Sequence, residues 1–345
     1  MLIRNIGQLW LGEGEVLRGH ALRIADGRID AILPEAELRM ASDSVIDAEG
    51  GVVLPGWVDP HTHLPHAGKI QGSFVDRCAA LESISEEDLE RSMRRRIEWM
   101  AQLGTTALEI KTAYATSAEG EAKCLRVMRR LRETSRTIVR TTLMDPIGDS
   151  VGADFIDSIG YSNARANNTQ RRKFHLGIDG PITNLAEALS QNPISVEHLL
   201  HASDADIATL AHSNAVAVLL PAMPYYTHAG RYAPARKLIE AGVTVALGTD
   251  SNPGDSPTDS MPFVIHLACR EMGVTVEEAI RMATLNAAKA IGIHREVGSI
   301  EIGKRAFLQI LATDDYRDVA ATMGSSLVLA TLRGNHVDYR VRPEF

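Results

Sequence analysis

The apolar residues of the chain follow two different patterns. Between residues 56 and 296, short apolar runs alternate with stretches in which apolar residues recur every three or four positions. This alternation is typical of parallel strands joined by helices that cover the sheet. The helical period is clearest over residues 86–103, and Gly104 favours a helix end directly after them. The other elements that we expect are strands at 105–110, 154–159, 215–220 and 243–247, and helices at 119–132, 234–241 and 276–290.

Both ends of the chain lack the helical period. Two short runs at 21–24 and 29–32 flank the pair Asp26-Gly27, which is a hairpin signal. Similar runs lie at 307–311 and 327–332. We therefore expect the two ends to build one small sheet domain beside the central part.

Composition narrows the class of ligand and the environment. The 345 residues include 36 basic and 44 acidic side chains, a formal charge of -8, which argues against nucleic acid as a partner and favours a small molecule. Three cysteines without a close pair predict no disulfide framework. No export signal or membrane-length apolar run is present, so we expect a cytoplasmic protein without membrane contact. The cysteines are Cys78, Cys124 and Cys269.

Five residues of metal-ligand type follow expected strands. His61 and His63 end an apolar run, and alternate residues of an extended chain point to the same side, so both imidazoles can face one ion. An isolated pair of this kind is equally well explained by two surface histidines. The other three residues favour a metal site only when all are considered together, because the carboxyl ends of barrel strands meet on one face. Taken singly, His175 and His198 also fit a packed core and Asp250 a turn.

Three segments carry a resemblance to a known family, namely 53–64, 105–114 and 215–292, the last with Gly248-Thr249-Asp250-Ser251-Asn252-Pro253-Gly254. On these segments the chain resembles the amidohydrolase superfamily and, within it, the imidazolonepropionases. The resemblance implies an α/β fold with a (β/α)8 TIM barrel over residues 56–296. It also implies a small β-sandwich from residues 1–55 and 297–345, and a homodimer.

The resemblance further implies one divalent metal ion bound by His61, His63, His175 and Asp250. Zinc suits three nitrogens and one carboxylate, with iron or manganese as alternatives. Such an ion activates water near neutral pH. Asp250 would then move the proton to the leaving nitrogen, and His198, beside the metal, would stabilise the oxyanion. The residues that we expect to contact substrate are Tyr114, Glu109, Lys111, Asn252, His66 and Arg77, with Tyr225, Tyr226 and His228 as further candidates that equally fit solvated loops.

Two substitutions and two short segments depart from the family pattern. Ile70 stands where an arginine that binds the substrate propionate is expected, and Ile178 stands where a glutamate or glutamine follows the third metal histidine. The segment after His63 and the region 149–173 are shortened, which predicts an irregular fourth βα unit. The changes affect substrate recognition more than metal binding.

The reaction that we predict is hydrolysis of a C–N bond in a small cyclic amide or amidine. A second hypothesis is a metal-dependent deaminase of a small heterocycle, which the missing glutamate after His175 disfavours. A third is a metal-binding scaffold that has lost turnover, for which Ile70 and Ile178 are the support.

Overall fold

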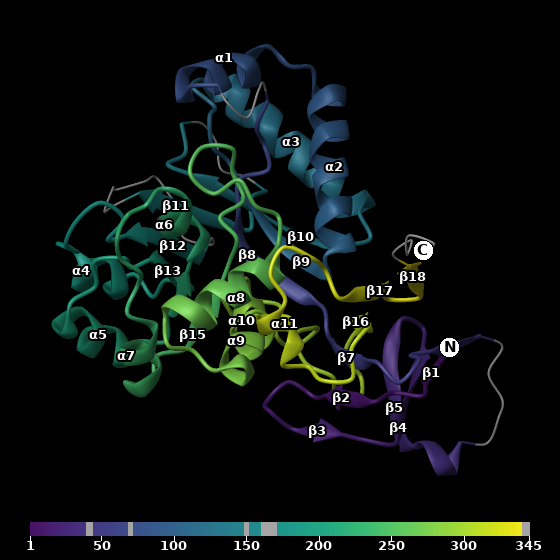
Figure 1. Ribbon diagram of the computed structural model, residues 1–345. Helices are drawn as coiled ribbons and strands as arrows, with labels where there is room; N and C mark the ends of the chain where they lie inside the picture. Colours follow the sequence, from purple (N-terminus) through teal and green to yellow (C-terminus); the bar gives the residue numbers. More distant parts are fainter. Residues whose placement is uncertain (39–43, 68–71, 148–151, 160–170, 340–345) are drawn as a thin grey trace.

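An eight-stranded parallel sheet forms the centre of the computed structural model, which describes residues 1–38, 44–67, 72–147, 152–159 and 171–339 (Figure 1). The strands lie side by side in chain order. Backbone hydrogen bonds close the sheet, because Asp250 N donates to His61 O at 3.0 Å and His63 N donates to Ser251 O at 2.9 Å. The predicted (β/α)8 barrel is therefore confirmed. Its strands are β8 (Trp57–Thr62), β9 (Thr105–Lys111), β10 (Ile138–Met144), β11 (Phe155–Ile159), β12 (Arg171–Leu176), β13 (Ser195–His198), β14 (Val216–Leu219) and β15 (Val245–Leu247).

Helices surround this barrel (Figure 1). One expected helix is wrong in its length: the capping box of Thr275 and Glu278 starts α9, but the helix stops at Met282. A new helix begins after Thr284, whose φ and ψ of -127° and -91° cannot continue a helix. None of the described helices is both long and apolar enough to cross a bilayer. The helices are α1 (Phe74–Ser83), α2 (Glu86–Gln102), α3 (Ala118–Thr134), α4 (Leu185–Ser190), α5 (Asp204–Ala211), α6 (Ala222–Tyr226), α7 (Ala235–Glu240), α8 (Met261–Glu271), α9 (Val276–Met282), α10 (Leu285–Ala290) and α11 (Asp318–Ala321).

The fourth strand of the barrel is β11, as the run at 154–159 predicts. It pairs in parallel with β10 and β12. The connection that follows it, residues 160–170, lies outside the described residues. The irregular fourth βα unit therefore remains a prediction.

Two smaller sheets pack beside the barrel (Figure 1). One combines both chain ends, because β7 pairs with β2 on one side and with β16 on the other. The other sheet contains the expected hairpin, with left-handed φ values of 49° at Asp26 and 72° at Gly27. Apolar side chains of the two sheets form one buried cluster, and we interpret the pair as the predicted second domain. Their strands are β1 (Leu2–Arg4), β2 (Gln8–Trp10), β3 (Val16–Leu17), β4 (His20–Ala25), β5 (Arg28–Pro34), β6 (Val45–Asp47), β7 (Val52–Pro55), β16 (Phe307–Leu311), β17 (Val328–Arg333) and β18 (His336–Tyr339), with a 3-10 turn η1 (Glu35–Glu37).

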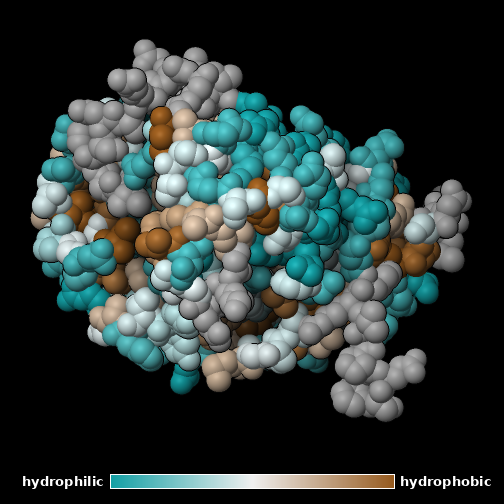
Figure 2. All heavy atoms as spheres, turned by 90° about the horizontal axis from the view of Figure 1, so that it is seen from above, coloured by the Kyte–Doolittle hydropathy of each residue, from teal (hydrophilic) through white to brown (hydrophobic). Residues whose placement is uncertain are grey.

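The surface seen from above is mainly hydrophilic, with hydrophobic residues in small separate groups (Figure 2). Phe74 and Val75, at the start of α1, are exposed by 62% and 73%. Scattered exposed apolar side chains are ordinary for a globular protein. Among the described residues, this face therefore carries no broad apolar patch in the view of Figure 2.

Candidate metal centre and cavity

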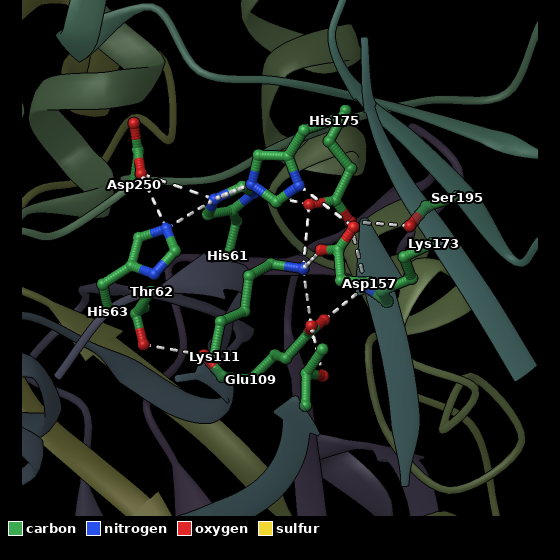
Figure 3. A network of polar contacts seen from close by, with 12 residues as sticks. His61, Thr62, His63, Glu109, Lys111, Asp157, Lys173, His175, Ser195 and Asp250 are labelled. Carbon is green, nitrogen blue, oxygen red and sulfur yellow. Dashed lines mark hydrogen bonds and ion pairs between the residues drawn. The ribbon is translucent and has the colours of Figure 1, made fainter. Parts of the chain in front are cut away.

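His61 and His63 lie at the carboxyl end of β8 and point to the same side (Figure 3). The backbone between them is fixed, since Thr62 Oγ1 donates to Glu109 O at 2.7 Å. Pairing with β9 shifts its register between Asp59 and Thr62. The two Nε2 atoms lie 3.1 Å apart.

His175 and Asp250 complete the group from other strands. His175 Nε2 lies 3.2 Å from His61 Nε2, and Asp250 Oδ1 lies 3.4 Å from the Nε2 atoms of both His61 and His63. Asp250 follows β15 with a φ of 54°, a conformation that aspartate tolerates better than most residues. Asn252 Nδ2 donates to its carbonyl at 2.7 Å and holds this turn. The structure thus brings together all four expected metal ligands.

The spacing around His61 suits ligands of one ion. Metal–ligand bonds of about 2.0–2.1 Å place tetrahedral ligands about 3.3–3.4 Å apart, and His61 Nε2 lies 3.1–3.4 Å from the nearest ligand atoms of His63, His175 and Asp250. The ligand atoms of the three histidines all lie within 4.8 Å of one another. Hydrogen bonding does not account for the group. His61 Nδ1 faces Glu197 and His175 Nδ1 faces Asp157, so the protons belong on Nδ1 and the Nε2 lone pairs face each other. A divalent cation is what such converging lone pairs bind.

Burial keeps His61 and His63 in the neutral state that binds metal. It is the main cause that lowers the pKa of His61 well below its usual range and that of His63 to about 3, so both imidazoles are neutral. Burial, and then the charge of Asp255, raise the pKa of the Asp250 carboxyl well above its usual range. A bound cation would favour the ionised carboxylate.

Two carboxylates that sequence reasoning missed support the histidines. Glu197 Oε2 contacts His61 Nδ1 at 2.5 Å, and Asp157 Oδ1 lies 3.0 Å from His175 Nδ1. Acceptors of this kind orient metal-binding imidazoles and raise their basicity. Such supporting residues have a signal in the sequence. Within a buried strand, a charged residue lies two positions from another polar residue, as in Lys173-x-His175 and Ser195-x-Glu197.

Glu109 and Lys111, which we expected at the substrate, lie beneath the histidines instead. Both are fully buried and lie outside the residues that line the cavity. Lys111 Nζ contacts Glu109, Asp157 and Glu197, and Lys173 Nζ contacts Glu109 and Glu197 (Figure 3). Because both side chains are buried inside the barrel, a molecule in the cavity cannot reach them. We assign them the role of supporting the carboxylates behind the histidines.

A cavity of about 400 Å³ opens over the metal ligands. Of the expected substrate contacts, Tyr114, Asn252 and Arg77 line it, and so does Ile178. His66 does not line it, and its Nδ1 lies 3.2 Å from Arg96 Nη2. Ile70 lies outside the described residues. The lining consists of His63, Phe74, Arg77, Ala113, Tyr114, Met144, His175, Ile178, His198, Asp250, Asn252, Gly254 and Asp255, without Tyr225, Tyr226 or His228.

Three side chains shape the mouth of the cavity. Helix α1 contributes Phe74 and Arg77 to the lining, one turn apart. The Phe74 ring lies 5.5 Å from that of Tyr114, and the Arg77 guanidinium lies 5.9 Å from the same ring centroid. The wall therefore combines aromatic surface with a cation.

His198 lies beside the ligand group at the end of β13. Its ring centroid is 5.0 Å from that of His175 and 5.4 Å from that of His61. Its Nδ1 is buried and has no hydrogen-bond partner within the described part of the chain. A polar nitrogen of this kind needs a partner from a bound molecule or water.

Comparisons with known proteins find relatives in sequence and in fold. The model of the amidohydrolase family matches residues 180–337. The imidazolonepropionase of Symbiobacterium thermophilum is 34% identical in an alignment that covers 93% of this chain and 90% of the relative. That of Mycolicibacterium smegmatis is 33% identical, covering 99% and 98%. A solved 5-methylcytosine deaminase from Klebsiella pneumoniae is 18% identical with a TM-score of 0.80, covering 100% and 98%, and shows the same fold.

Proposed function

The chain belongs to the amidohydrolase superfamily and is a metal-dependent hydrolase of C–N bonds, and we propose that its substrate is a small cyclic amide or amidine. The observation that carries this proposal is the convergence of His63, His175 and Asp250, which line a cavity, on the fully buried His61. A cavity of about 400 Å³ suits a molecule of one small ring with a short substituent.

Zinc is the ion that we propose for the centre. Three imidazole nitrogens and one carboxylate oxygen form a donor set that zinc prefers, and iron or manganese are the alternatives. When bound, the ion activates a water molecule and polarises the carbon–oxygen or carbon–nitrogen bond under attack.

Two residues of the chain would move charge during hydrolysis. Asp250 lies at the cavity floor, where its carboxylate can accept a proton from the attacking water and deliver it to the ring nitrogen. The water oxygen bonds to the ring carbon as the C–N bond breaks, so the proton and the electron pair both end on nitrogen. His198, through a ring nitrogen, would hydrogen-bond the oxygen that gains negative charge.

Recognition of the substrate would fall to the cavity wall. We propose that Arg77 binds an acidic substituent and that the ring of Tyr114 packs on the heterocycle. Asn252 Oδ1 accepts hydrogen bonds from Gly254 N and Asp255 N, at 2.8 and 3.0 Å, so it mainly shapes the wall. Ile178 lines the cavity and no glutamate does, among the described residues. That lining favours ring opening over deamination.

A panel of cyclic amides, amidines and nucleobases tests the proposal. Zinc-loaded enzyme is expected to open a cyclic amide or amidine, seen as loss of ring absorbance, the mass of one added water and no free ammonia. Asp250→Asn should lose this activity, whereas Glu278→Gln, at the remote ion pair with Arg236, should keep it. Ammonia released in step with substrate loss would point to a deaminase. No turnover of any compound would point to a scaffold.

We further propose a homodimer in the cytoplasm that acts without nucleic acid or membrane partners. The net charge of -8 supports the absence of nucleic acid. Sedimentation at several protein concentrations tests the oligomer, and a monomer throughout would contradict it.

A further inference from the structure

Lys111 occupies the centre of the buried charges behind the metal ligands (Figure 3). Its Nζ lies 2.8 Å from Glu109 Oε1, 2.5 Å from Asp157 Oδ2 and 2.9 Å from Glu197 Oε2. All four side chains are fully buried. One ammonium group therefore has a carboxylate oxygen from each of three strands around it.

The same place is suited to a metal ion. Asp157, His175 and Glu197 each offer a ligand atom within 4.8 Å of the others. Oxygen atoms that are brought this close inside a protein need a cation between them, supplied either by the chain or from solution. In this chain Lys111 supplies it.

We propose that the ammonium group of Lys111 takes the place of a second divalent ion and so limits the centre to one metal. Asp157 and Glu197 then stay hydrogen-bond acceptors of His175 and His61 and do not become metal ligands. Lys111 is a positioning residue in this account, because it lies outside the cavity lining and acts through the carboxylates.

Lys111 and Lys173 contribute the same charge to the cluster but occupy different positions in it. Lys173 is equally buried, and its Nζ contacts Glu109 and Glu197 Oε1, the oxygen that does not face His61. Three carboxylates and two ammonium groups leave one net negative charge in the cluster. Loss of either lysine adds one negative charge, but only loss of Lys111 opens the space between Asp157 and Glu197.

Metal content provides the test. Lys111→Met is compared with the matched control Lys173→Met after loading with excess zinc and removal of unbound ions. Zinc per folded chain, measured by mass spectrometry of the digested protein, is expected to be one in the wild type and the control and to approach two in Lys111→Met. Equal rises in both variants would overturn the proposal, because the effect would then come from charge alone.

A second variant guards against misfolding. Lys111→Met combined with Glu109→Gln has the net charge of the wild type but still vacates the position among Asp157, His175 and Glu197. We expect it to fold and to bind a second ion as well. One zinc per chain in every folded variant, or failure of both Lys111 variants to fold even in excess zinc, would refute the assigned role. A wild type without any zinc would instead refute the metal centre itself.

Discussion

Glu197→Gln should weaken zinc binding without touching a metal ligand. The Glu197 carboxylate is fully buried and has partners on both oxygens. Oε2 faces His61 Nδ1 at 2.5 Å and Lys111 Nζ at 2.9 Å, whereas Oε1 accepts from Ser195 Oγ at 2.6 Å and Lys173 Nζ at 3.1 Å. A glutamine keeps an acceptor oxygen at only one of these two positions and places an NH2 donor at the other.

Either orientation of the amide has a cost. If its NH2 group faces His61, the imidazole has to accept at Nδ1, and its proton moves to the Nε2 that binds the metal. If the NH2 group faces Lys173, two donors meet and a charge-assisted hydrogen bond worth about 1.5–3 kcal/mol is lost. Loss of such a partner typically reduces metal affinity about 10–100-fold. That range corresponds to about 1.4–2.8 kcal/mol.

Competition with a chromophoric chelator at constant pH measures this affinity. Ser195→Ala is the matched control, because it removes one hydrogen bond to the same carboxylate but leaves its charge and its contact with His61. We expect the control to bind zinc more tightly than Glu197→Gln, because Glu197 keeps its charge and its contact with His61, although loss of a hydrogen bond to a charged group costs about 1.5–3 kcal/mol of stability. The reasoning is refuted if folded Glu197→Gln binds zinc as tightly as the control.

Three further predictions concern catalysis, recognition and the fold. Asp250→Asn should lower kcat for C–N hydrolysis by about 10²–10⁴, the usual contribution of a positioned proton acceptor; a kcat near that of the wild type would exclude the assigned role. Arg77→Met should reduce kcat/KM about 10–100-fold for a substrate with a carboxylate and leave the same ring without it unaffected, since a charge-assisted hydrogen bond contributes about 1.5–3 kcal/mol; equal losses for both would contradict acid recognition. Gly104→Ala should lower the free energy of unfolding by about 1–3 kcal/mol, because Gly104 has a φ of +91° and a Cβ there would lie 2.4 Å from Gln309 Oε1; an unchanged urea midpoint would contradict this.

The sequence predicts that the expected metal ligands lie close together, because strand geometry places them. His61 and His63 alternate along one strand, and a parallel barrel brings the ends of its strands to one face. Those two rules predict that His175, His198 and Asp250 approach the pair, and the family resemblance implies which of them are metal ligands. The observed separations of 3.1–3.4 Å also reflect the turn held by Asn252 and the carboxylates that orient His61 and His175.

The sequence does not predict how deep in the barrel a residue near a strand end lies. Glu109 and Lys111 belong to the same barrel face as the ligands, but they lie one layer further in, and the carboxyl end of β9 is at Lys111. A position near a strand end therefore does not tell a cavity residue from one beneath it. The break at Thr284 was also missed, because residues 276–290 keep an apolar pattern across two helices.

Zinc-edge X-ray absorption and anomalous diffraction on crystals of the zinc-loaded wild type test the central claim most directly. We expect one zinc ion within bonding distance of His61 Nε2, His63 Nε2, His175 Nε2 and Asp250 Oδ1, with a spectrum of mainly imidazole ligands. A folded, active enzyme whose zinc lies elsewhere, or that turns over C–N bonds without any metal, would contradict it.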